Sequence, residues 1–103
     1  MDNKFVNNYN QDLSNLLNDI NVKDLNKSIE LIKRVKKKDA KIILAGNGGS
    51  AALSSHVAVD FTKTTKIRAT NFNEADLITC FANDYGYENW LSQALKSYAK
   101  KMI

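Results

Sequence analysis

Two groups of residues near the middle of the chain have types and spacing suited to chemistry. The first is the glycine-rich segment Gly46-Asn47-Gly48-Gly49-Ser50, which follows the apolar run Lys41-Ile42-Ile43-Leu44 and holds three of the chain's four glycines. A β-branched run that breaks into glycines predicts a strand leading into a helix through a turn whose backbone approaches a ligand closely. Because unpaired amides and the positive end of the helix dipole meet there, we expect the turn to bind a phosphate.

Ser50 is placed either to cap that helix or to donate its hydroxyl to a phosphate oxygen. The alternative for the whole segment is an ordinary tight turn with Ser50 as the N-cap.

The second group is His56 and Asp60, four residues apart on the predicted helix, so that both side chains project from one face. A carboxylate beside an imidazole can move a proton and hold an oxygen that gains charge. We expect this pair to lie beside the glycine turn and complete one site. The alternative is a histidine that only packs or is solvated.

The pattern of apolar residues predicts the elements that position these groups. Two amphipathic helices fill the first forty residues, with a break near residues 18–21 and Asn21 or Asp24 starting the second helix. A strand at 41–45, a helix at about 50–64 and a strand at 66–70 form a right-handed βαβ unit with a parallel pair. A helix capped within residues 73–76 runs to about Ala82, residues 83–86 break it, and a last helix follows from Tyr87.

Composition indicates one ordinary globular domain. The chain has 103 residues, 44% of them hydrophobic and 25% charged, with a net charge of +4. The basic runs at 33–38 and 100–101 are read as solvated helix ends, so we expect no nucleic-acid partner, although binding by this cluster stays an alternative. The single cysteine, Cys80, is expected to be a buried small hydrophobe and permits no disulfide within the chain. We find no signal-peptide pattern and no apolar stretch long enough to cross a bilayer, so a cytoplasmic location is expected.

Residues 1–38 form the leading helices and residues 40–103 a β-α-β-α-α core. The apolar face of the first helix packs either on another subunit or on the chain's own sheet. Since a two-stranded parallel sheet leaves both edges unpaired, we expect the single domain, residues 1–103, to be incomplete.

Residues 46–52, with Ser55, His56 and Asp60, and then Phe81-Ala82-Asn83-Asp84-Tyr85-Gly86-Tyr87-Glu88, resemble the sugar isomerase (SIS) domain of the sedoheptulose 7-phosphate isomerases, also called phosphoheptose isomerases. The resemblance covers essentially the whole chain, but only the amino-terminal half of such a domain. It implies an α/β fold with a flavodoxin-like parallel sheet, a homotetramer with active sites between subunits, and the interconversion of sedoheptulose 7-phosphate and glycero-manno-heptose 7-phosphate.

The resemblance also implies roles for single residues. Asn47, Gly48 and Gly49 would line the phosphate of the sugar, and Asn83 and Asp84 would hydrogen-bond the sugar's hydroxyls. His56 would be a zinc ligand, and Asp60 would contact both metal and substrate as the general base.

Three departures from the family's pattern stand out. Asp60 replaces a glutamate, and Thr64 replaces an arginine, with Lys63 beside it as a possible substitute. The family's second phosphate loop and its carboxy-terminal Gln and His have no counterpart, so two zinc ligands are present where catalytic zinc normally takes three.

Two other functions stay open. Gly46, Gly48 and Ala51 also satisfy the loose dinucleotide-binding fingerprint, but Arg68-Ala69-Thr70-Asn71 occupies the neighbourhood where an acid should hold the ribose. The other is a non-catalytic phosphosugar-binding or assembly module.

Overall fold

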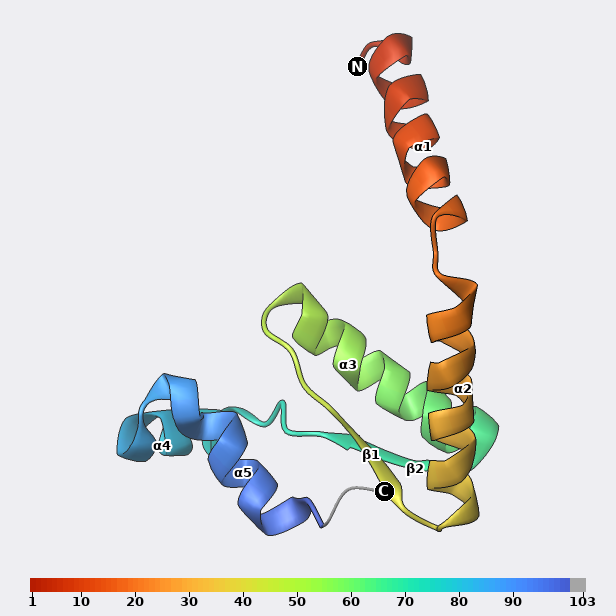
Figure 1. The fold of residues 1–103 in the computed structure, drawn as a ribbon. Coiled ribbons are helices and arrows are strands. Elements are labelled where there is room, and N and C mark those ends of the chain that lie inside the picture. Colours follow the sequence, from red (N-terminus) through yellow and green to blue (C-terminus); the bar gives the residue numbers. More distant parts are fainter. Residues whose placement is uncertain (101–103) are drawn as a thin grey trace. The chain divides into compact units, whose positions relative to one another are not determined.

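The computed structural model describes residues 1–100. The chain divides into two compact units, Met1–Ile32 and Lys33–Ile103. Its elements, in order, are α1 (Asn3–Asn18), α2 (Val22–Lys37), β1 (Lys41–Leu44), α3 (Gly49–Asp60), the π-helix η1 (Phe61–Thr65), β2 (Arg68–Asn71), α4 (Ala75–Tyr85), the 3-10 helix η2 (Tyr87–Asn89) and α5 (Trp90–Tyr98) (Figure 1). The predicted order of elements, and with it a mixed α/β class, is confirmed.

Polar side chains cap both leading helices. The backbone amide of Lys4 donates to Asp2 Oδ1 (2.9 Å) at the start of α1. Asn21 Oδ1 accepts from the amides of Lys23 (3.0 Å) and Asp24 (3.2 Å), so Asn21 rather than Asp24 caps α2. The basic run closes α2 in its last turn, as predicted. Of the second predicted basic run, residues 100–101, Lys101 lies outside the described residues. No side chain of α1 is buried.

Replacing Asn21 with alanine should destabilise α2 by about 1 kcal/mol, because two amides of its first turn lose their acceptor. The helical signal in circular dichroism should fall and its thermal loss should begin at a lower temperature. Asn18→Ala is the control, since the Asn18 side chain caps neither helix. An equal loss of signal in both variants would contradict the assignment of the cap.

The sheet consists of β1 and β2 in parallel, with Lys41 opposite Arg68 and Leu44 opposite Asn71. The second strand was predicted two residues too early. Lys66 adopts a left-handed conformation (φ 60°) that ends the preceding helix, and the buried Ile67 leads into the strand. A left-handed residue cannot continue a strand, which is why pairing begins at Arg68.

Threonine hydroxyls account for the π-helix that follows α3. Thr62 Oγ1 donates to the Ala58 carbonyl oxygen (2.9 Å) and Thr65 Oγ1 to that of Phe61 (2.6 Å), so hydroxyls compete with amides for the carbonyls of the turn. Thr62 Oγ1 also accepts from the Ala69 amide (3.4 Å) and lies 3.5 Å from the Ala69 carbonyl oxygen, at the outer edge of β2.

A small hydrophobic core lies where α4 and α5 meet the strands. Phe72, Trp90 and Ala94 form its buried centre, and the partly buried residues around them are Ile43, Leu77, Ile78, Phe81, Leu91 and Leu95. The helix α3 contacts both strands and lies on the other side of them from α5 in Figure 1. The turn that joins β1 to α3 lies at the carboxyl end of β1.

Two details of α4 correct the predictions. The helix continues to Tyr85 and ends at Gly86 (φ 86°), so Asn83 and Asp84 lie within its last turn and not in a break. Cys80 is exposed, contrary to the prediction of a buried thiol. Leu77 and Phe81 turn toward the core, and Cys80 falls on the other face of the helix. Nor does a side chain of residues 73–76 cap α4, since its N-cap Glu74 makes no such bond.

Across residues 1–100 the helices are all too short or too polar to cross a membrane.

Candidate functional site

The glycine turn places backbone amides at the start of α3. Gly48 is the N-cap, with φ 55° and ψ −122°, a conformation that side chains disfavour. The amides of Ser50, Ala51 and Ala52 donate to carbonyls at Asn47 and Gly48. Within residues 1–100 the amides of Gly48 and Gly49 donate to no protein acceptor. Two donors at the positive end of a helix therefore remain for an anion.

Ser50 holds the turn closed and is not its N-cap, which corrects one predicted role. Its hydroxyl accepts from the Asn47 amide (2.9 Å) and donates to the Asn47 carbonyl oxygen (2.7 Å). Gly46 permits this closure, because a Cβ there would meet the backbone carbonyl carbon of Ser50 at 2.5 Å. The hydroxyl is thus occupied by the turn itself.

The two segments that carry the family resemblance meet through one side-chain hydrogen bond. Tyr87 Oη donates to Asn47 Oδ1 at 2.9 Å. A hollow of about 310 Å³ opens here, with Gly46, Asn47, Tyr87 and Trp90 in its lining. Tyr87 was not among the functional residues predicted from the sequence. The one feature that could have indicated it is its position in the segment 81–88, which carries part of the family resemblance.

Asn83 and Asp84 are exposed in the last turn of α4 and contact each other. Asn83 Nδ2 donates to Asp84 Oδ1 (3.2 Å), and the Cys80 thiol lies 3.7 Å from Asp84 Oδ2. Neither residue is hydrogen-bonded to the glycine turn in the described part of the chain. Their side chains remain accessible to a hydroxylated ligand.

His56 and Asp60 form the predicted pair on one face of α3. His56 Nε2 and Asp60 Oδ2 are 3.5 Å apart, and the two side chains are 76% and 60% exposed. The pair does not lie beside the glycine turn of the same chain, however. Asp60 is the last residue of α3, and the rise from Gly48 to Asp60 along the helix is about 18 Å.

The described residues do not by themselves form a zinc site. In residues 1–100 no group of three or more His, Cys, Asp or Glu side chains is placed to hold a metal. His56 and Asp60 would supply two ligands, whereas catalytic zinc normally takes three from protein.

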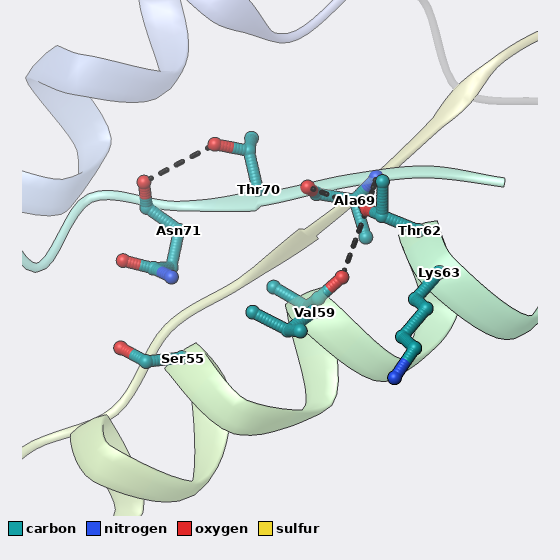
Figure 2. A pocket seen from close by; sticks show the side chains of 8 residues that line it. Ser55, Val59, Thr62, Lys63, Ala69, Thr70 and Asn71 are labelled. Carbon is teal, nitrogen blue, oxygen red and sulfur yellow. Dashed lines mark hydrogen bonds between the residues drawn. The ribbon is translucent and has the colours of Figure 1, made fainter. Parts of the chain in front are cut away.

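A second hollow, of about 360 Å³, lies between α3, η1 and β2. Figure 2 shows Ser55 and Thr62 along α3 and η1, facing Ala69, Thr70 and Asn71 of β2. Its hydroxyls are engaged within the fold: that of Ser55 accepts from Asn73 Nδ2 (2.8 Å) and that of Thr70 donates to the Asn71 carbonyl oxygen (3.3 Å).

Lys63 also lines this second hollow. Its amino group is directed away from β2 in Figure 2. The next residue, Thr64, is exposed.

Several curated proteins named phosphoheptose isomerase are similar to this chain. It is 36% identical over 84 residues to "Phosphoheptose isomerase 2" of Campylobacter jejuni, a match that covers 74% of this chain. It is 30% identical over 83 residues to the phosphoheptose isomerase of Helicobacter pylori strain P12 (75% of this chain). The Fusobacterium nucleatum enzyme of the same name is 29% identical over 84 residues (77%). The matches span only 40%, 43% and 43% of these relatives' own lengths.

No protein-family model matches the chain. No solved structure matches it either. By its similarity to these named relatives, the chain belongs to the phosphoheptose isomerase family.

Proposed function

We propose that this chain binds a heptose 7-phosphate and takes part in its aldose–ketose isomerisation, from sedoheptulose 7-phosphate to glycero-manno-heptose 7-phosphate. The observation that carries the proposal is that the backbone N–H groups of Gly48 and Gly49 have no acceptor within residues 1–100. They sit at a helix start, where a phosphate is stabilised without a dedicated cation. The choice of a heptose as the sugar rests on the family to which the chain belongs.

Each residue of the site has a proposed role. The amides of the glycine turn and the Asn47 side chain bind the phosphate end, with Ser50 holding the turn in shape. Asn83 and Asp84 bind hydroxyls of the sugar chain. Asp60 removes the proton from one carbon of the carbonyl-bearing pair and returns it to the other, and His56 stabilises the enediol oxygen.

The length of α3 favours a site shared between two copies of the chain. An extended seven-carbon sugar is shorter than the rise of about 18 Å from Gly48 to Asp60. One substrate molecule would have to lie fully extended along α3 to contact both of its ends. The glycine turn of one copy would lie beside His56 and Asp60 of another, as in the homotetramer and larger SIS-type sheet that the family resemblance implies.

A non-catalytic phosphosugar-binding module is the second candidate. It is favoured by the separation of the His56–Asp60 pair from the glycine turn and by the exposure of both side chains. In that case the chain would bind the phosphosugar through the turn without turnover.

Calorimetric titration distinguishes these possibilities. The chain should bind sedoheptulose 7-phosphate more tightly than inorganic phosphate and should not bind NAD. Absence of phosphosugar binding would overturn the proposal, and NAD binding would favour a dinucleotide site. Conversion of sedoheptulose 7-phosphate, followed by NMR, would then separate an isomerase from a binding module.

Exchange of the substrate's carbon-bound hydrogen with deuterated water tests Asp60 directly. The Asp60→Asn variant should exchange about 100-fold more slowly, because an amide cannot take up the proton. Asp12→Asn on the exposed face of α1 is the matched control and should exchange at the unaltered rate. Equal exchange by Asp60→Asn and the unaltered chain would remove Asp60 from the mechanism.

A further inference from the structure

Tyr87 is joined to the glycine turn by a contact that its packing does not require. Its ring belongs to η2 and is 56% exposed, so burial does not explain the position of its hydroxyl. That hydroxyl donates to Asn47 Oδ1 at 2.9 Å. A phenylalanine would occupy the same half-exposed place with the same apolar contacts. The hydroxyl therefore acts on Asn47 alone.

Asn47 is already fixed at its backbone. Ser50 Oγ accepts from the Asn47 amide (2.9 Å) and donates to its carbonyl oxygen (2.7 Å). The remaining freedom of Asn47 is rotation of the side chain, and the bond from Tyr87 restricts it. With Oδ1 accepting from Tyr87, both protons of Asn47 Nδ2 remain for a ligand.

Tyr87 lies between a sharp turn of the backbone and a buried residue. Gly86, with φ 86°, turns the chain out of α4 into η2, and Trp90, which directly follows η2, is only 6% exposed in the core. The hollow beside the bond, about 310 Å³, is large enough for part of a small ligand. Asn47 and the buried Trp90 both line this hollow, so the side-chain amide of Asn47 lies at a space bordered by a core residue.

We propose that Tyr87 is a positioning residue that orients the Asn47 carboxamide so that its NH₂ group donates to the bound phosphosugar. The inference rests on the proposed function, because it names how one of the binding side chains is held. Fixing a donor before binding reduces the entropy lost on binding, and affinity rises without any contact between Tyr87 and the ligand.

The first test uses NMR of the ligand-free chain. In Tyr87→Phe the side-chain carboxamide resonances of Asn47 should move toward values of a freely rotating amide. The matched control is Tyr85→Phe, since the Tyr85 ring packs edge-on against Phe81 (5.6 Å between centroids) and is similarly exposed, at 50%. Unmoved Asn47 resonances in Tyr87→Phe would overturn the inference whether or not the chain binds a sugar.

The second test is calorimetric titration with sedoheptulose 7-phosphate. Tyr87→Phe should weaken binding about fivefold, the effect of one neutral hydrogen bond, while Tyr85→Phe should bind as the unaltered chain does. In an Asn47→Ala background, Tyr87→Phe should have no further effect. A further loss in that background would show that Tyr87 contacts the ligand itself, and would overturn the positioning role.

If the unaltered chain binds no sedoheptulose 7-phosphate, the proposed function and the ligand role of Asn47 both fail. A moved Asn47 resonance in Tyr87→Phe would then still establish that Tyr87 orients the side chain. The two failures are therefore distinguishable.

Discussion

Replacing Gly46 with alanine should collapse the glycine turn and abolish phosphosugar binding. The new Cβ would lie 2.5 Å from the backbone carbonyl carbon of Ser50, 2.6 Å from its carbonyl oxygen and 2.7 Å from Oγ. Two of these atoms belong to the first turn of α3 and cannot move without unwinding it. Overpacking of this kind costs about 3 kcal/mol, and here it also displaces the hydroxyl that holds Asn47.

The effect should appear in two measurements. Urea denaturation should give a lower free energy of unfolding, and titration with sedoheptulose 7-phosphate should give no heat of binding. Gly49→Ala is the control for stability, because nothing lies within 4 Å of a Cβ built there and its amide is retained. Its free energy of unfolding should change by less than about 1 kcal/mol. A Gly46→Ala variant as stable as Gly49→Ala would show that the turn is not closed as described.

Replacing Trp90 with alanine should remove most of the stability of the second unit. Trp90 is 6% exposed and forms the buried centre of the core with Phe72 and Ala94. Truncating a buried tryptophan costs about 3–5 kcal/mol. Since whole domains are stable by only about 5–15 kcal/mol and this core is small, the native state should be barely populated.

Far-ultraviolet circular dichroism in urea is the appropriate measurement, because Trp90 is the chain's single tryptophan and the variant has lost its fluorescence. Trp90→Phe should recover part of the loss. Leu53→Ala, on the exposed face of α3 where Leu53 is 63% exposed, should change the free energy of unfolding by less than about 1 kcal/mol. Equal losses for Leu53→Ala and Trp90→Ala would mean that the Phe72–Trp90–Ala94 cluster is not the core.

The sequence predicted the order of elements because each carries a local signal. Apolar residues at helical spacing marked α1, α2 and α5, and the β-branched run before the glycines marked β1. The pairing of His56 with Asp60 followed from helix geometry alone. The candidate turn was predicted from its glycines, because a cluster of glycines marks backbone conformations that other residues disfavour.

The errors arose where a local sequence pattern fits more than one structure. Ser50 looks like an N-cap from its position after the glycines, but its hydroxyl bonds the backbone of Asn47 behind it. Cys80 lies in an apolar run, yet the period of the helix turns it away from the core. Asn83 and Asp84 resemble a break, whereas only Gly86 has the positive φ that ends the helix.

The separation of Asp60 from the glycine turn was also missed. Sequence spacing gives the face of a helix on which a residue lies, and the distance between two functional groups then depends on the length of that helix. Likewise no local pattern relates Tyr87 to Asn47, because their bond joins residues forty positions apart.

The hydroxyl of Thr62 occupies part of one edge of the sheet. It accepts from the Ala69 amide and lies close to the Ala69 carbonyl oxygen, and these are the groups that a further strand would need on the outer side of β2. Within residues 1–100, no side chain is hydrogen-bonded to the backbone along the opposite edge of the sheet, at β1. We therefore expect a strand added to this sheet to pair with β1.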